Sequence, residues 1–319
     1  MTNTFHFIKK NKKIIQSFSG AILIGIVIWQ SNPEKLYNQI FDVPLYYLIP
    51  CFLLYYLLVT LTWAVGIYFL LIRIKKDTFW KIIKSSFKLQ VIAAITPGRL
   101  GDIGLLYYLK GEYTSGQLGA IFFIDKLITL GINIVISIIG FGILLSWKYA
   151  VVISFFLIAI FSLLICFLFK FPQKFINWGI FKNIIVYLQG FRVELNATAR
   201  DIKGIAGNVV LTLVRYILAG GCMLLALLWF GQHVTLINVI LIQAVAQLAT
   251  FIPLTTMGLG VTEAVCISLF ITIGVSSEMT LAALLWSRAI YLMFIAGIYL
   301  LWTGMPVYYK VFKKITPAE

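Results

Sequence analysis

The stretch from Leu118 to Leu145, LGAIFFIDKLITLGINIVISIIGFGILL, decides the fold of this chain. It contains only two charged side chains, Asp125 and Lys126, which are adjacent in its first half. A helix needs about 20 predominantly apolar residues to cross the roughly 30 Å hydrocarbon core of a bilayer. The stretch therefore predicts a transmembrane helix.

Five further stretches have the length and apolar character of a membrane span. They are residues 14–31, 45–72, 149–169, 208–230 and 280–303. The chain is 61% hydrophobic and 12% charged, which is about half the charged fraction of an ordinary soluble domain. We therefore expect an all-α polytopic membrane protein with about six full transmembrane helices in a single membrane domain over residues 1–319. This composition excludes soluble enzymes, secreted modules and disordered chains.

The basic residues indicate the orientation of the chain. Lys and Arg outnumber Asp and Glu by 26 to 11, but they lie in loops between apolar runs, which argues against a nucleic-acid partner. Four basic segments fall on one face of the predicted membrane domain: residues 9–13, 73–88, 170–203 and 310–314. By the positive-inside rule that face is cytoplasmic. Six crossings then place both termini in the cytoplasm. We expect the protein to lie in the plasma (inner) membrane.

The longest loop, residues 170–207, mixes apolar and basic side chains. This mixture favours either an amphipathic helix on the inner leaflet or a solvated linker between two halves of the protein. The cysteines and histidines are few and widely spaced: Cys51, Cys166, Cys222, Cys266, His6 and His233. Such spacing gives no metal site and no disulfide framework, and we expect no cofactor.

Two apolar stretches are interrupted before they could cross a membrane. Phe87 to Thr96 runs into PGRLGD at residues 97–102, and Leu236 to Ile252 runs into PLTTMGLGVTE at residues 253–263. A helix does not continue comfortably through Pro followed by Gly. We therefore expect two re-entrant helical hairpins, the alternative being two Pro-kinked surface helices. The expected backbone hinges are Pro97, Gly98, Gly101, Pro253, Gly258 and Gly260.

The two interruptions have matching chemistry. Asp102 is followed after 24 residues by Lys126, and Glu263 is followed after 25 residues by Arg288, each base lying inside a predicted span. Because the hairpins would enter from opposite faces, this pattern predicts an inverted repeat, with a first repeat at about 45–145 and a second at about 208–303. Paired Gly/Pro interruptions in such repeats point to a transporter's substrate site.

Several ionisable residues lie at or near membrane depth, where each costs roughly 2.5 to 3.5 kcal/mol on insertion scales. Arg215 is two turns from the cytoplasmic end of its span, so its side chain is expected to reach the membrane surface. The others are expected to line a hydrated substrate site between the hairpins: Arg99, Asp102, Asp125, Lys126, Glu263 and Arg288. The alternative is that Asp102–Lys126 and Glu263–Arg288 are ion pairs that only fasten each hairpin to the next span.

Four motifs taken together resemble the membrane domain of bacterial lysyl-phosphatidylglycerol synthases, a flippase-like family that also occurs as stand-alone membrane proteins. They are the segment 97–102, the Asp125–Lys126 pair, the segment 253–263, and Arg288 before Tyr291. The likeness covers about residues 10–305. The family often has Glu in place of Asp102 and Asp125, and Arg in place of Lys126. These substitutions keep the charge. They change the length of the acidic side chain and the ability of the basic side chain to form two parallel hydrogen bonds.

The resemblance implies movement of a polar-headed lipid, such as a phospholipid or a polyprenyl lipid, between leaflets. The sequence ends without the soluble synthase domain, so we expect a transporter rather than an enzyme. A membrane glycosyltransferase acting on a polyprenyl-linked sugar, and an ion-coupled carrier of small solutes, are the alternatives. The expected partner is a membrane lipid, and the pattern also allows a homo-oligomer.

Overall fold

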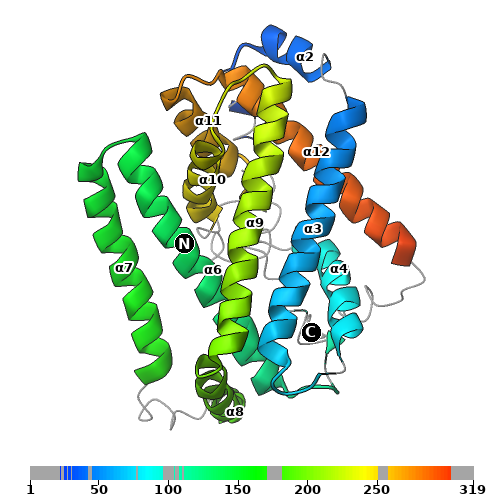
Figure 1. The fold of residues 1–319 in the computed structure, drawn as a ribbon, viewed down its shortest axis with the longest axis vertical. Coiled ribbons are helices and arrows are strands. Elements are labelled where there is room, and N and C mark those ends of the chain that lie inside the picture. Colours follow the sequence, from blue (N-terminus) through cyan, green and yellow to red (C-terminus); the bar gives the residue numbers. More distant parts are fainter. Residues whose placement is uncertain are drawn as a thin grey trace, which may run out of the picture.

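The fold is entirely helical in the part of the chain that the computed structural model describes. Ten helices are present there and no strand (Figure 1). The described residues are 22, 25–26, 28–29, 31–41, 45–76, 78–95, 104, 108–109, 111–170, 182–250 and 258–302.

Four helices are long and apolar enough to cross a membrane. They are α3 (Leu45–Leu71), α6 (Ser115–Leu144), α9 (Ile202–Trp229) and α12 (Ser277–Trp302). A fifth long apolar helix, α7 (Trp147–Lys170), packs against α6. These five helices cover five of the six expected spans. Most of the remaining expected span, residues 14–31, lies outside the described residues.

Two short helices follow α9 and occupy the position of the second expected hairpin. They are α10 (Leu236–Thr250) and α11 (Val261–Thr272). At 1.5 Å per residue they are only about 22 Å and 18 Å long, shorter than the hydrocarbon core of a bilayer. The two helices pack against each other, and α10 also packs against α6 and α9. Neither helix is therefore long enough to cross a membrane by itself.

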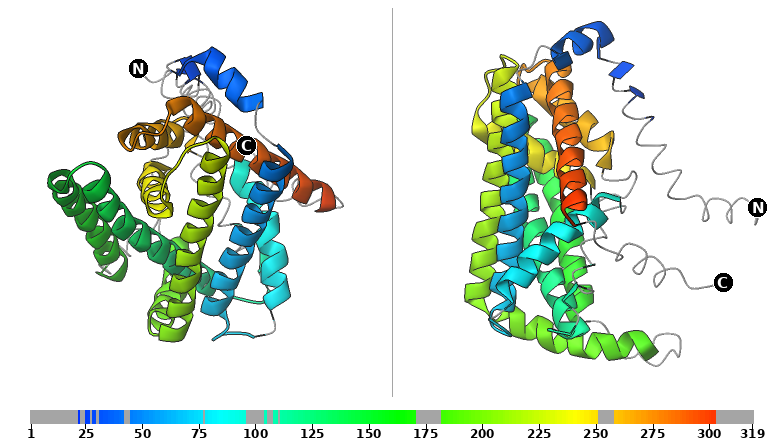
Figure 2. Two further views of the ribbon diagram at one scale, coloured as in Figure 1. Left: turned by 45° about the horizontal axis from the view of Figure 1, so that its top comes forward. Right: turned by 90° about the vertical axis from the view of Figure 1, so that its right-hand side faces the viewer.

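Two helices lie across the ends of the bundle (Figure 2). At one end α8 (Lys182–Ala199) packs against α6, which confirms a helix within the expected loop 170–207. At the opposite end lies α2 (Pro33–Phe41), which the hydrophobic pattern did not predict. It packs on α12, where the indole N–H of Trp286 donates to the carbonyl of Ile40 at 3.1 Å.

The helix α4 (Phe79–Ile95) differs from expectation at its start. The apolar pattern indicated a helix from Phe87, but the helix begins eight residues earlier and includes Lys81 and Lys84. Both lysines are exposed, whereas Ile82, Ser85 and Ser86 are buried. A helix with one charged face escapes a search for uninterrupted apolar runs, and this is the physical reason for the difference.

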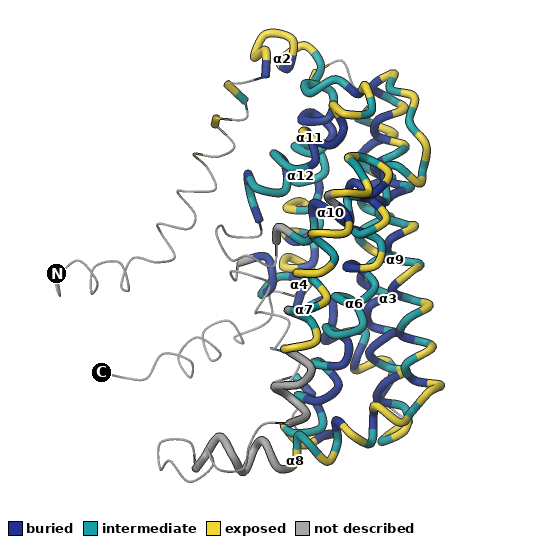
Figure 3. The backbone as a smooth tube through the Cα atoms, turned by 90° about the vertical axis from the view of Figure 1, so that its left-hand side faces the viewer, coloured by how far each residue is buried: buried dark blue, intermediate teal, exposed yellow. Residues whose placement is uncertain are grey.

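The buried apolar residues form two separate cores, and Figure 3 marks the buried positions along the backbone in dark blue. One core joins the first half of α3 to α2, α9, α10, α11 and α12, and includes Phe52 and Phe270. The other joins the second half of α3 to α4, α6 and α8, and includes Ile67 and Ile121. The middle of α3 passes between them, so polar side chains from neighbouring helices can gather there without breaking either core.

Ion pairs fasten the end of the bundle where α3 turns into α4. Arg73 pairs with Glu194 of α8. Glu112, just before α6, pairs with Lys75 and also accepts from Lys81 at 2.8 Å. Hydrogen bonds from the two ammonium groups hold the pKa of Glu112 at about 2, below its usual 4.5. A lowered pKa means that the folded state favours the charged carboxylate.

Glu112→Gln is expected to lower the free energy of unfolding at neutral pH, because the variant loses both ion pairs. The wild-type advantage is complete above pH 4.5 and is lost as the pH falls toward 2, where the carboxylate becomes protonated. Thermal unfolding of both proteins in mild detergent between pH 7 and pH 3 measures the difference. High salt should reduce this difference in stability. Glu34→Gln, at an exposed position of α2, is the control. An unchanged gap across this pH range would contradict the prediction.

Candidate functional site

Glu263 lies in the first turn of α11, directly after a backbone turn made by glycines. Gly258 and Gly260 have φ values of 70° and 82°, a region that residues other than Gly rarely adopt. The amide of Gly260 donates to Oε2 of Glu263 at 2.8 Å. A carboxylate here is also favoured by the partial positive charge at a helix N-terminus. The turn therefore fixes one carboxylate oxygen and leaves the other to face α12.

The second carboxylate oxygen of Glu263 meets Arg288 of α12. Arg288 Nε donates to Oε1 at 2.9 Å, and its Nη2 donates to the hydroxyl of Thr262 at 3.1 Å. The Glu263 side chain is 1% exposed, whereas that of Arg288 is 29% exposed. A buried carboxylate therefore holds a cation that remains partly accessible.

Aromatic and polar residues join this ion pair to α3 and α4. The hydroxyl of Tyr56 on α3 donates to the carbonyl of Ser287, next to Arg288, at 2.8 Å. Tyr291 lies one turn further along α12, with its ring centroid 5.0 Å from that of Tyr56. Its hydroxyl donates to Gln90 of α4 at 3.4 Å. The surroundings of Arg288 therefore include the helix that leads into the first expected interruption.

Asp125 of α6 forms a second charged cluster. Its side chain is 0% exposed. It accepts from Trp63 Nε1 of α3 at 3.2 Å and from Asn208 Nδ2 of α9 at 3.1 Å. Arg215 and Lys126 place cationic nitrogens 4.0 Å and 3.8 Å from its oxygens. This carboxylate therefore ties three long helices together.

Two cations lie near Asp125, and one of them, Arg215, differs from expectation. Arg215 was expected to extend to the membrane surface, but its side chain is only 17% exposed and turns to Asp125 and to the hydroxyl of Thr212. Lys126 is adjacent in sequence to Asp125 yet lies within ion-pair distance of it, because its long side chain folds back. Its ammonium also lies 5.0 Å from the ring centroid of Phe122 and 5.7 Å from that of Trp63.

Both clusters lie well inside the spans that carry them, near the middle of α12 and about a third of the way along α6. Arg288 is the twelfth residue of α12, and Asp125 is the eleventh of α6, so each is about 15 Å along its helix. Tyr56 and Trp63, which touch the two clusters, are two turns apart on α3, or about 10 Å along its axis. Glu263 and Asp125 bind different residues, and the two carboxylates therefore form two neighbouring clusters.

The six expected substrate-binding residues are only partly described. The Glu263–Arg288 ion pair that the sequence suggested is present. Its expected counterpart is Asp102–Lys126, of which Asp102 falls outside the described residues. So do Arg99, Pro97, Gly98, Gly101 and Pro253. Sequence reasoning missed Trp63 and Asn208, although a lone polar side chain within an apolar span, such as Asn208, is a usable signal.

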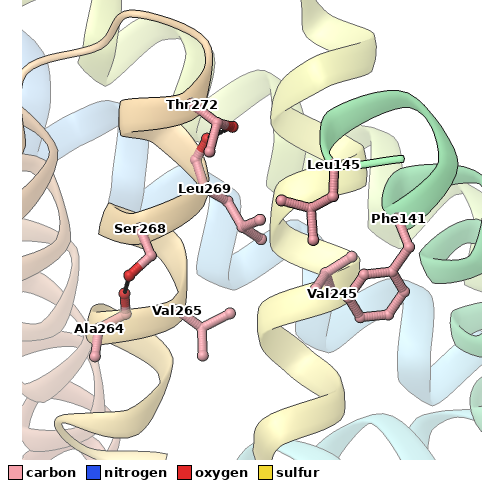
Figure 4. Close-up of a pocket in the computed structure, with 8 residues that line it drawn as sticks. All are labelled: Phe141, Leu145, Val245, Ala264, Val265, Ser268, Leu269 and Thr272. Carbon is pink, nitrogen blue, oxygen red and sulfur yellow. Dashed lines mark hydrogen bonds between the residues drawn. The ribbon is translucent and has the colours of Figure 1, made fainter. Parts of the chain in front are cut away.

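An apolar groove lies beside α11, with a volume of about 420 Å³. Figure 4 shows Leu145 and Leu269 extending toward one another across it. Its lining residues come from α10, α11, and α6 with the residue that follows it: Phe141, Leu145, Val245, Ala264, Val265, Ser268, Leu269 and Thr272. The Ser268 hydroxyl donates to the carbonyl of Ala264 within α11 at 2.8 Å, so it adds little polarity to the groove. Over the described ranges, no group of three His, Cys, Asp or Glu side chains is placed to hold a metal ion.

A model of the protein family described as the lysylphosphatidylglycerol synthase TM region matches residues 14–298. The match covers well over half of the chain, so the protein belongs to this family. Comparison of this chain with the curated proteins and with the solved structures found no match.

Proposed function

We propose that this family member moves a lipid with a polar head group between the leaflets of the plasma membrane. One observation carries the proposal: the buried carboxylate of Glu263 holds the guanidinium of Arg288, whose side chain is partly exposed, midway along a membrane-length helix. Charges at this depth are costly and mark substrate or ion pathways. An accessible arginine fork also matches the oxygens of a phosphate group.

The arrangement of α10 and α11 supports a re-entrant hairpin in the second half of the protein. Helix α10 begins just beyond the end of α9, and helix α11 ends just before α12. Both of these points lie at the same end of the bundle (Figure 1). Irregular backbone at membrane depth is tolerated only within protein or beside a water-filled cavity. A hairpin that stops half-way through the membrane would therefore hold Glu263 at the edge of such a cavity.

An inverted repeat belongs to the same proposal. Lys126 and Arg288 are each the twelfth residue of their helices, α6 and α12. In the first half the long helix α3 and the short helix α4 precede α6, and in the second half the long helix α9 and the short helices α10 and α11 precede α12. With both termini in the cytoplasm, rocking of one repeat against the other would open the site to each leaflet in turn.

In this mechanism the guanidinium of Arg288 neutralises the lipid phosphate, assisted by Arg99 and Lys126. Asp102 and Glu263 receive a cationic or hydroxylated head group. The acyl chains remain in the bilayer, so the protein has to shield only the polar part of the lipid from hydrocarbon. The energy needed at the centre of the bilayer is the cost of burying the head group, and the charged site offsets that cost.

The purified protein in vesicles tests this function. A fluorescent head-labelled phospholipid placed in the inner leaflet is expected to become accessible to an external quencher much faster than in protein-free vesicles. Native mass spectrometry of the gently purified protein should identify the bound lipid. Equal rates with and without protein would contradict lipid transport. Release of free polyprenyl phosphate from a synthetic sugar donor would instead indicate a glycosyltransferase.

A further inference from the structure

A row of polar side chains runs along one face of α6, from Asp125 toward the C-terminal end of the helix. Residues four apart share a helix face, and every fourth residue from Asp125 onward belongs to one such row. Its members, in order, are Asp125, Thr129, Asn133, Ser137, Phe141 and, just past the helix end, Leu145. The first four are polar and the last two are apolar. We call Thr129, Asn133 and Ser137 the α6 polar row.

The polar side-chain atoms of the α6 polar row are buried without hydrogen-bond partners within the described residues. Asn133 and Ser137 are 0% exposed. Neither amide atom of Asn133 has a partner, nor does the hydroxyl of Ser137 or Thr129, in the part of the chain that the structure describes. Such groups are costly in a membrane interior, where water cannot satisfy them. Three in succession on one face indicate groups that bind something in another state of the protein.

The upper part of the α6 polar row faces α10. A Cβ at Gly140 would lie 3.2 Å from the carbonyl oxygen of Leu241 and 3.0 Å from the side chain of Val245, so α6 and α10 touch closely there. Ser137 precedes Gly140 by one turn on the same face. Phe141 and Val245 then line the apolar groove. The row therefore leads from a buried carboxylate, along α10, into the groove.

A further unpartnered group lies on the other side of α10. The hydroxyl of Tyr216 on α9 is buried without a hydrogen-bond partner within the described ranges. One turn above it, Gly220 packs against Ile240 and Leu236 of α10, so Tyr216 lies on the face of α9 that meets α10. Unpartnered polar groups therefore come from both helices that flank α10.

We infer that the α6 polar row binds the hydroxyl-bearing head group of a lipid when α10 moves away from α6. This inference rests on the proposed function and identifies the head-group chemistry. The row's side chains are uncharged, and each can donate and accept, which matches hydroxyl groups. The adjoining groove is apolar and suits an acyl chain. The polar atoms of the row are shielded from solvent, so the row is closed in this structure.

Cysteine accessibility in vesicles tests the inference. Ser137→Cys and Asn133→Cys are made in a background in which the four native cysteines are replaced by alanine, and each is treated with a membrane-impermeant methanethiosulfonate. Thiol reaction requires the hydrated thiolate, so both are expected to react at least about tenfold faster than Val135→Cys. Val135 is 59% exposed on the outside of the same helix and faces lipid. A Lys148→Cys variant, exposed beyond the end of α6, reports reagent activity.

A comparison of two lipids shows whether the α6 polar row is occupied by a lipid head group or by water. Phosphatidylglycerol carries two hydroxyls, whereas phosphatidylmethanol has the same charge and none. Labelling of Ser137→Cys should be several-fold slower in phosphatidylglycerol vesicles, while labelling of Lys148→Cys should be equal in both. Thermal unfolding in mild detergent confirms that each variant is folded. No labelling at either row position, or equal rates in the two lipids, would overturn the inference.

Lipid translocation measured on the same vesicles distinguishes this inference from the proposed function. If the protein translocates lipid but phosphatidylglycerol does not slow the labelling of Ser137→Cys, the inference about the α6 polar row is contradicted and the proposed function is not. Protection without translocation contradicts the transport function and leaves the row as a lipid-binding site.

Discussion

Asp125→Ala is expected to destabilise the folded protein by about 3–5 kcal/mol, the usual cost of breaking a buried charge pair from one side. Asp125 is 0% exposed and accepts from Trp63 and Asn208. Without the carboxylate, the side-chain N–H groups of Trp63 and Asn208 would lose their acceptor. The charge of Arg215 would lose a nearby opposite charge, and all three groups would remain buried. Because the three helices α3, α6 and α9 meet at this side chain, the whole bundle should be affected.

Unfolding by a denaturing detergent, followed by helical circular dichroism, measures this loss. Asp125→Asn keeps an acceptor for one donor and removes the charge, so its cost should be smaller. Lys126→Met is the matched control, because that side chain is 39% exposed and can lose its charge more cheaply. An Asp125→Ala protein within about 1 kcal/mol of wild type would show that the cluster does not hold the helices together.

The long helices could be located from the sequence because membrane spanning requires a simple property, an apolar run of sufficient length. This property identified α3, α6, α7 and α12 to within three residues at each end, and α9 except for its first six residues. It failed for α2, a nine-residue amphipathic helix. Local signals for that helix were present: Pro33 is its first residue, and the side chain of Asn32 accepts from the amide of Lys35 at 3.2 Å. Asn before Pro is typical of a helix start.

The partners of the charged residues were harder to predict. Glu263 and Arg288 could be paired because a repeated spacing connected them. Asp125 finds Trp63 and Asn208 at 62 and 83 positions' separation, and no periodicity links such distant residues. The unpartnered groups of the α6 polar row were also not foreseen. A single Asn, Ser or Thr in a span is common, and only burial shows that these three lack partners.

Arg288→Ala is expected to reduce lipid translocation strongly. Losing a hydrogen bond to a charged group costs about 1.5–3 kcal/mol, which corresponds to roughly a 10- to 150-fold lower rate if that bond stabilises the rate-limiting state. Arg288→Lys keeps the charge but not the fork that contacts both Glu263 and Thr262, so its loss should be intermediate. Arg200→Ala, exposed at the end of α8, should translocate like wild type.

The double variant Glu263→Met/Arg288→Met decides whether this ion pair acts on the lipid or only fastens α11 to α12. Buried ion pairs can often be replaced by apolar side chains of similar volume without loss of stability. If the pair is only a fastener, the double variant should fold and translocate normally. If Arg288 receives the phosphate, the protein should remain folded, as judged by thermal unfolding, but lose translocation as fully as Arg288→Ala does. Because both side chains act in one contact, the two single losses should not add. A folded double variant with wild-type translocation would remove Arg288 from the transport mechanism.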